Sequence, residues 1–207
     1  MLRFSKALSF AVSALVLALP AAPAQAQWTE PPAGYTYQQL ASCPEKYKRY
    51  LACDDQMAIF NAAAKRAQAN NRKLLVVFGG DWCPWCKIID PELQKAEYLK
   101  HPDLDGKFEV VWIAYNVIKN SRKVSVPSGV AVENLLRPHM QVDQPTGFVP
   151  FFVVVEPKLP KPVVGIGNGR IADVVENKAV YIPTDFRRIM LEVTGQLDQI
   201  AAKSKVN

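Results

Sequence analysis

The fold of this chain is decided by residues 74–87, Leu-Leu-Val-Val-Phe-Gly-Gly-Asp-Trp-Cys-Pro-Trp-Cys-Lys. The first five residues are apolar and include two β-branched valines, a pattern typical of a strand that is buried on both faces. The pair Gly79-Gly80 ends this strand. A helix is predicted to begin near Cys83 and to run to about Lys100, with a kink at Pro91. The stretch therefore predicts a strand, a turn with two cysteines, and a helix.

The spacing of Cys83 and Cys86 has a chemical consequence. At a helix start, Cys83 lies beside unpaired backbone N–H groups and the positive end of the helix dipole, and both favour its thiolate. Two intervening residues bring Cys86 within reach of the same sulfur, and such pairs can have a cysteine pKa of roughly 3.5–7.5 instead of about 8.5. A thiolate attacks a disulfide sulfur to form a mixed disulfide, which the neighbouring thiol resolves. We predict that Cys83, the more exposed cysteine, attacks and that Cys86 resolves.

Two other interpretations of this pair stay open, a zinc half-site and an inert disulfide. Zinc usually needs four ligands from cysteine and histidine. The chain has no second Cys-x-x-Cys motif, and the other candidate ligands are Cys43, Cys53, His101 and His139. We therefore favour redox chemistry, with no metal and no cofactor beyond the Cys83–Cys86 disulfide itself.

Helical and strand patterns alternate along the rest of the chain. A helix with Asp54 or Asp55 as its N-cap is predicted to end at Asn70-Asn71. A C-terminal helix capped by Thr184 or Asp185 is predicted from apolar residues at helical spacing. Further strands are predicted at 108–116, 151–155 and 163–166, and a long polar connection at 117–146 with a short helix around 130–136. Alternation of this kind indicates an α/β sandwich around a central sheet.

Residues 74–87 resemble the strand–turn–helix of the thioredoxin superfamily, including the tryptophan before the first cysteine and the proline five residues after the second. Residues 147–155, Gly-Phe-Val-Pro-Phe-Phe-Val-Val-Val, resemble the loop of that family in which a cis-proline leads into a strand. The resemblance covers roughly residues 54–203 and implies a central mixed β-sheet flanked by helices, with an N-terminal extension and an insertion before the proline strand. It also implies a cis bond at Pro150 and contacts to substrate from Trp82, Pro84, Trp85, Val149 and Pro150.

Two positions depart from the family pattern. Thioredoxins carry a buried aspartate in the strand before the motif, where this chain has Val77. The position of their partner lysine on the next strand aligns with Trp112. The proton role is thereby left to Asp81, Asp90 or water, and the preferred direction of exchange does not follow from the motif.

The first 26 residues are predicted to be a secretory signal. Arg3 and Lys6 precede an apolar run, and the segment ends in the cleavage pattern Ala24-Gln25-Ala26. The run at 7–19 is shorter than the roughly 20 apolar residues that span a bilayer, so we expect cleavage near Ala26 and a periplasmic or secreted product with no stable membrane insertion. Loss of two basic residues lowers the formal net charge from +6 to +4, and such a mild excess does not indicate nucleic-acid binding.

Disulfides persist in exported proteins, so the predicted export is compatible with a disulfide between Cys43 and Cys53. They lie in the predicted extension 27–53, ahead of the predicted domain 54–207. A structural disulfide that closes a small loop is the favoured interpretation, and a second redox pair that exchanges with Cys83 is the alternative.

These features together predict an exported thiol–disulfide oxidoreductase acting on protein thiols and disulfides, leaning to reductase or isomerase service with a membrane or soluble redox partner. A non-enzymatic module that binds client proteins or copper is the alternative. His139 is expected to be a loop residue, and Gly165-Ile166-Gly167-Asn168-Gly169 a turn rather than a phosphate loop.

Overall fold

The structure is a computed structural model, which describes residues 28–40, 43, 49–94, 99–140, 149–159, 163–166, 172–175 and 178–204. The predicted signal at 1–26 lies outside these residues. Within the described part of the chain, no helix is both long enough and apolar enough to cross a membrane.

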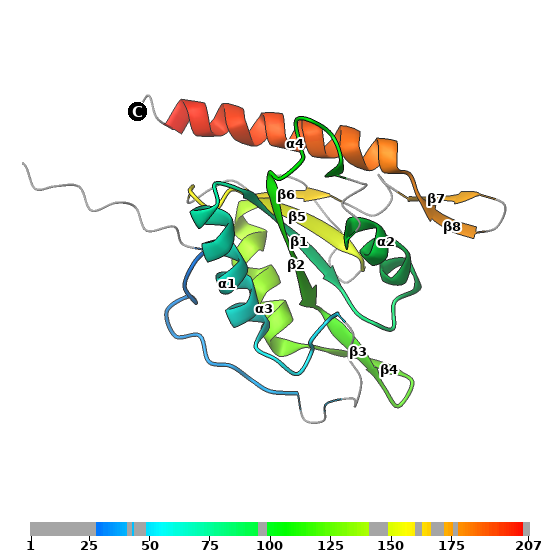
Figure 1. Cartoon of the computed structure of the whole chain (residues 1–207). Helices are drawn as coiled ribbons and strands as arrows, with labels where there is room; N and C mark the ends of the chain where they lie inside the picture. The colour runs from blue at the N-terminus through cyan, green and yellow to red at the C-terminus, as the bar shows by residue number, and fades with distance from the viewer. Residues whose placement is uncertain are drawn as a thin grey trace, which may run out of the picture.

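A four-stranded mixed sheet forms the centre of the molecule, in the order β2-β1-β5-β6 (Figure 1). Its strands are β1 (Lys73–Gly79), β2 (Phe108–Ala114), β5 (Phe151–Val155) and β6 (Val163–Ile166). Strand β1 pairs in parallel with β2 and antiparallel with β5, and β5 pairs antiparallel with β6. Because both of its edges are paired and both of its faces covered, β1 is apolar almost throughout. The predicted strands and the α/β architecture are confirmed.

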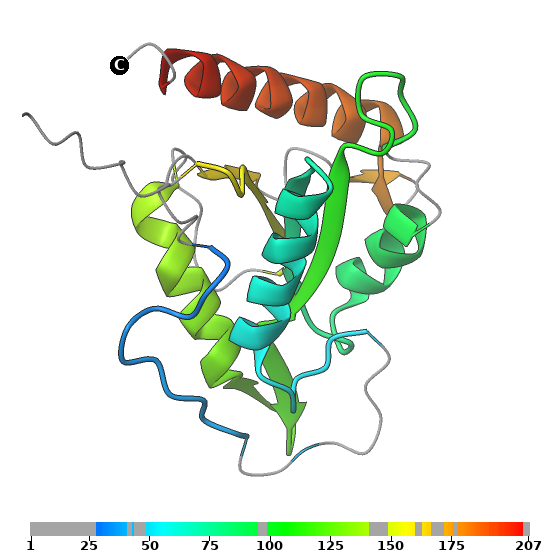
Figure 2. The same ribbon diagram turned by 60° about the vertical axis from the view of Figure 1, so that its left-hand side comes forward.

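One face of the sheet is covered by α1 (Gln56–Ala69) and α3 (Pro127–Leu136), which contact each other and lie side by side in both ribbon views (Figure 2). Helix α1 begins after Asp55, whose carboxylate accepts hydrogen bonds from the amides of Met57 and Ala58. Its small apolar side, Ala63, Ala64 and Ala67, packs with the alternate β1 residues. The predicted helix and its cap are confirmed.

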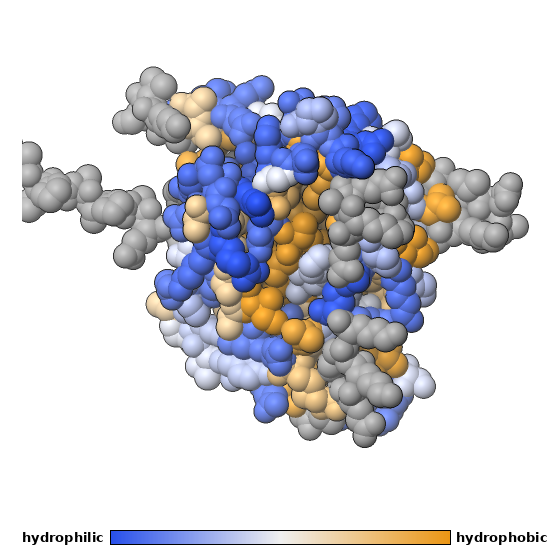
Figure 3. Space-filling view, in the orientation of Figure 1, coloured by the Kyte–Doolittle hydropathy of each residue, from blue (hydrophilic) through white to orange (hydrophobic). Residues whose placement is uncertain are grey.

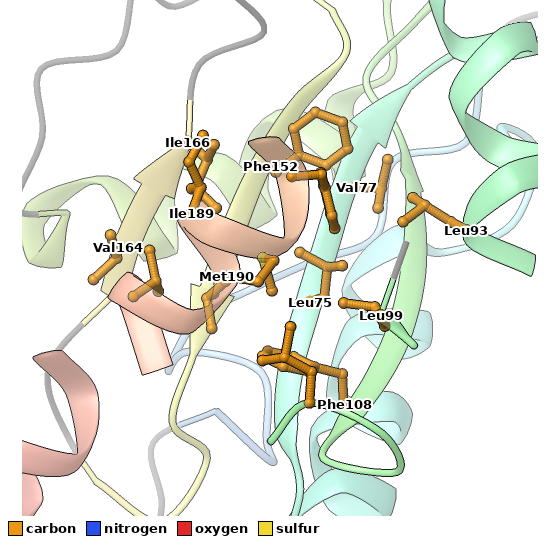
Figure 4. Close-up of a cluster of buried hydrophobic side chains, with 14 of the residues drawn as sticks. Leu75, Val77, Leu93, Leu99, Phe108, Phe152, Val164, Ile166, Ile189 and Met190 are labelled. Atoms are coloured by element: carbon orange, nitrogen blue, oxygen red, sulfur yellow. The ribbon is translucent and has the colours of Figure 1, made fainter. Parts of the chain in front are cut away.

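The other face carries α2 (Pro84–Gln94) and α4 (Pro183–Ser204). Leu75, Val77 and Phe152 point from the sheet toward Ile189 and Met190 of α4 and Leu93 of α2 (Figure 4). Hydrophilic residues cover α4 and the outer side of α1, with apolar residues between them (Figure 3). Two helices are therefore held on each face of the sheet by separate apolar clusters.

The predicted boundaries were wrong in several places. Helix α2 is described over Pro84–Gln94 with Pro91 inside it, and 95–98, where the prediction continued it toward Lys100, lie outside the described residues. Helix α4 begins at Pro183, where proline at the first helical position has no amide to leave unpaired. Strand β2 ends at Ala114, and the segment predicted as a polar connection begins instead with a hairpin and a longer helix.

That hairpin consists of β3 (Asn116–Lys119) and β4 (Arg122–Ser125). Asn120 and Ser121 both have positive φ, of 48° and 60°, which suits the two-residue turn that joins right-twisted strands. A second hairpin, β7 (Ala172–Val175) and β8 (Lys178–Tyr181), was also not predicted. Both hairpins extend beyond the layers of the sandwich (Figure 1).

Gly129 allows α3 to pack closely against the end of β2. A Cβ at this position would collide with the carbonyl oxygen of Ala114. We expect Gly129→Ala to lower the free energy of unfolding by about 1–3 kcal/mol, because main-chain atoms must move. Gly195→Ala on α4 is the matched control, since nothing lies within 4 Å of its Cβ and alanine favours helix by about 1 kcal/mol. Urea unfolding measures both, and equal stability of the two variants would contradict the packing argument.

Candidate active site

The two cysteines lie where β1 passes into α2. Gly80 follows the last residue of β1, and its carbonyl oxygen accepts a hydrogen bond of 2.9 Å from the Cys83 amide. Pro84 is the first residue of α2 and is exposed, so Cys83 precedes the helix and Cys86 lies in its first turn. The order predicted from the sequence, a strand followed by a turn and a helix, is confirmed.

The two thiols are free and differ in environment. The Cys86 amide donates a hydrogen bond to Cys83 Sγ over 3.2 Å. Hydrogen bonds from the Cys86 thiol and from the amides of Cys86 and Trp85 lower the pKa of Cys83, against the effect of burial. Burial, followed by the hydrogen bond to Cys83, raises the pKa of Cys86. Of the two thiols, Cys83 is therefore the one that ionises first.

The exposure of the two thiols differs less than expected. Cys83 is 2% exposed and Cys86 is fully buried, so Cys83 is the more exposed thiol by only a small margin. The distinction between them is mainly in their pKa values: the Cys86 thiol, followed by the amides of Cys86 and Trp85, lowers the pKa of Cys83, whereas burial raises that of Cys86.

The loop before β5 lies directly against Cys83. The Val149–Pro150 bond is cis, and the Cys83 thiol is 3.6 Å from the carbonyl oxygen of Val149. The structure thus brings Cys83, Val149 and Pro150 together from segments 66 residues apart. Residues 147 and 148 lie outside the described part of the chain.

The two tryptophans of the motif are half-buried and are fixed by the hairpins that the sequence did not reveal. The indole N–H of Trp82 donates to the backbone and side-chain oxygens of Asn116 at 3.0 and 2.9 Å, and the Lys123 ammonium lies 4.7 Å above its ring. Trp85 makes an edge contact with Tyr181 at the end of β8, with ring centroids 5.7 Å apart. The strands that carry Asn116 and Lys123 are short and polar, and the sequence therefore did not predict that they would contact Trp82.

A buried carboxylate lies one helical turn beyond Cys86. Asp90 is 5% exposed, and its Oδ1 accepts hydrogen bonds from the Tyr50 hydroxyl at 3.0 Å and the Trp112 indole at 3.2 Å. The Arg49 guanidinium is 3.6 Å from Oδ2 and 5.3 Å from the Trp112 ring. Burial raises the pKa of Asp90 to about 6, although the bonds from Tyr50 and Trp112 and the charge of Arg49 lower it.

The N-terminal extension therefore contributes to the site. Tyr50 is 1% exposed and packs in one cluster with Cys83, Cys86 and Ala114. Its ring occupies the space that a side chain at position 79 would need, which explains why Gly79 carries none. Nothing in the sequence around Tyr50 indicated this contact, since it joins residues 40 positions apart.

The second cysteine pair lies in the same extension. Cys43 and Cys53 form a disulfide with a Cα–Cα distance of 5.7 Å.

Trp28, elsewhere in the extension, is fully buried. Its indole N–H donates a hydrogen bond to the Leu159 carbonyl, and its own carbonyl accepts one from the Asn61 side chain. The extension is thereby attached to the domain at both ends.

The other residues considered from the sequence lie apart from this arrangement. His139 belongs to a 3-10 helix (Arg137–His139) and makes an edge contact with Trp28, whereas it was expected in a loop. Gly165 and Ile166 belong to β6, and 167–169 lie outside the described residues. Within the described part of the chain, no group of three or more His, Cys, Asp or Glu residues is placed to hold a metal ion.

Comparison with known proteins gives one family match. Residues 60–158 match the family model of a thioredoxin-like domain. No curated protein and no solved structure gives a significant match. The matched segment contains the sheet strands β1, β2 and β5, the two free cysteines and the cis-proline, on which the resemblance of the sequence also rested. Residues 60–158 of this chain are a thioredoxin-like domain.

Proposed function

We propose that this protein is a thiol–disulfide oxidoreductase that exchanges disulfides with protein substrates through Cys83 and Cys86. The observation that carries the proposal is the position of Cys83 Sγ, which accepts the Cys86 amide and faces the Val149 carbonyl. A nucleophile with a lowered pKa therefore lies beside a backbone oxygen that can pair with the amide of an extended substrate segment.

The chemistry takes place in two displacements. The Cys83 thiolate attacks one sulfur of a substrate disulfide, the substrate S–S bond breaks, and the other substrate sulfur leaves as a thiolate. Cys86 then attacks Cys83 Sγ in the mixed disulfide, forming the Cys83–Cys86 bond and releasing the second substrate thiolate. The substrate gains two electrons and the protein loses two, and a dithiol donor must restore the reduced pair.

Trp82, Pro84 and Trp85 would line the substrate side of this reaction. Trp82 and Trp85 are half-buried and pack against the cluster that contains Cys83, and Pro84 is exposed. Aromatic side chains of this kind supply contact area at low entropic cost. We infer that Val149 and Pro150 position the substrate strand against Cys83.

An insulin-reduction assay tests the proposal. With dithiothreitol as the donor, we expect the wild type to accelerate insulin precipitation well beyond dithiothreitol alone. The double variant Cys83→Ser, Cys86→Ser, which lacks both sulfurs, is expected to give only the background rate. A wild type without activity would refute the proposed enzymatic function. Copper analysis of the reduced protein would then test the alternative, a non-enzymatic module that binds copper.

The direction of exchange and the compartment are part of the proposal. We infer export from the predicted signal at 1–26, and N-terminal sequencing of the mature protein would test cleavage near Ala26. In an oxidising compartment, reductase or isomerase activity requires a membrane or soluble dithiol partner that keeps the cysteine pair reduced. The reduction potential of the pair is expected nearer to the roughly −270 mV of thioredoxin than to the roughly −120 mV of a strong oxidant.

A further inference from the structure

The resolving thiol is buried, so its proton needs a defined acceptor. Cys86 is fully buried, and burial together with its hydrogen bond to Cys83 raises its pKa. A neutral thiol is a poor nucleophile, and attack on the mixed disulfide therefore requires that the proton leave Cys86 first. Water has little access to a side chain in this position.

Asp90 is placed to take that proton. Cys86 and Asp90 are separated by four positions in α2, so their side chains lie on the same helix face with Cβ atoms about 5–6 Å apart. Tyr50 links the two residues, since its ring packs beside Cys86 and its hydroxyl donates to Asp90. Side chains that start this close can bring the Cys86 sulfur and an Asp90 oxygen within reach of one hydrogen bond, along which a proton can pass.

The surroundings of Asp90 fix its orientation and keep it able to ionise. Its Oδ1 accepts from Tyr50 and Trp112, and its Oδ2 faces Arg49. The titratable and charged groups that face it are Cys86 from α2, Asp81 and Cys83 from the preceding turn, and Arg49 and Tyr50 from the extension. From β2 comes Trp112, which does not titrate.

A buried carboxylate of this kind weakens the folded state. Its pKa of about 6 lies above the ordinary 3.8, so the folded protein binds the proton more tightly than the unfolded chain does. Stability is therefore lost as the pH rises from about 4 to about 6, and at pH 7 the charged form is the less favourable one to bury. A group that costs stability and ionises near neutral pH suits proton transfer.

We propose that Asp90 accepts the proton of Cys86 when Cys86 resolves the mixed disulfide, and that Tyr50 and Arg49 position it for this step. The inference rests on the proposed function. The Cys86 proton moves to an Asp90 oxygen, the Cys86 sulfur attacks Cys83 Sγ, and the Cys83–substrate bond breaks with its electron pair on the departing substrate sulfur. When a dithiol donor later reduces the Cys83–Cys86 disulfide, Asp90 returns the proton to the Cys86 thiolate.

Single-turnover kinetics with a chromogenic aromatic disulfide separate the two steps. The first equivalent of coloured thiolate is released when Cys83 attacks, and the second when Cys86 resolves. In the wild type we expect the rate of the second release to rise through about pH 6 and then level off. Asp90→Asn keeps an oxygen for Tyr50 and Trp112 but cannot take a proton. It is expected to slow the second release about 100-fold at pH 7 and to remove the levelling of its pH profile, while the rate of the first release changes far less.

Tyr50→Phe provides an independent variant that leaves the carboxylate in place. The Tyr50 hydrogen bond lowers the Asp90 pKa, so its loss is expected to move the midpoint of the second release to higher pH. Circular dichroism checks that both variants fold, and Asp90→Asn is expected to be at least as stable as the wild type at pH 7. An unchanged pH profile in both variants would overturn the proposal for Asp90. A wild type with no second release would instead refute the proposed function.

Discussion

Cys86→Ser is expected to convert the protein from a catalyst into a trap. Cys83 keeps its position before the first turn of α2, so it still attacks a substrate disulfide, but no thiol resolves the product. Mixed disulfides should therefore accumulate on Cys83, and turnover in the insulin assay should fall by on the order of a hundredfold or more. Non-reducing electrophoresis with mass spectrometry of the adduct measures both effects.

Cys83→Ser is the matched control for the trap, because it removes the other sulfur of the same pair. Cys86 is fully buried, so this variant is expected neither to turn over nor to form adducts. Adducts of similar yield on both variants would contradict the assigned order of attack and resolution. The range of substrates captured by Cys86→Ser also separates a general oxidoreductase from a module with one client.

The double variant Cys43→Ser, Cys53→Ser is expected to lose about 3 kcal/mol of unfolding free energy. The bond joins residues 10 positions apart, and closing a loop of that size removes about this much chain entropy from the unfolded state. Urea unfolding under non-reducing conditions measures the loss. A stability equal to that of the wild type would contradict a structural clamp.

The same variant decides between the two interpretations of the Cys43–Cys53 pair. A structural clamp predicts that insulin turnover persists at temperatures where the variant is folded. A redox relay predicts that turnover falls even there, because electrons would no longer pass between the pairs. Reduction of the clamp in the wild type should lower stability by a similar amount.

The elements that the sequence revealed are those with long or continuous apolar patterns. Five apolar residues before Gly79 were enough to predict β1, and the spacing of Phe186, Ile189, Met190 and Val193 was enough to predict α4. Hairpin β3–β4 was missed because its strands have four residues each and carry lysine and arginine, which mimic a polar connection. Its turn residues, Asn120 and Ser121, were the one local signal available.

The cysteines of the site were evident from their spacing, but the groups around them were not. Val77 and Trp112, aligned from the family pattern, are direct partners in the β1–β2 register. The sequence left the proton role to Asp81, Asp90 or water, and only the burial of Asp90 against Tyr50 and Trp112 distinguishes it. Such contacts join distant segments and follow no period, so they emerge only when the chain is folded.

The place of Tyr50 has a consequence for how this protein can be divided. The family match begins at residue 60, yet the ring that fills the space above Gly79 and binds Asp90 comes from residue 50. A fragment cut at the family boundary would keep both cysteines and lose part of their surroundings. Grafting Cys-Pro-Trp-Cys into another thioredoxin-like scaffold would likewise transfer the two sulfurs without their neighbours. The working unit of this chain is larger than its recognisable domain, and it is not portable as a motif.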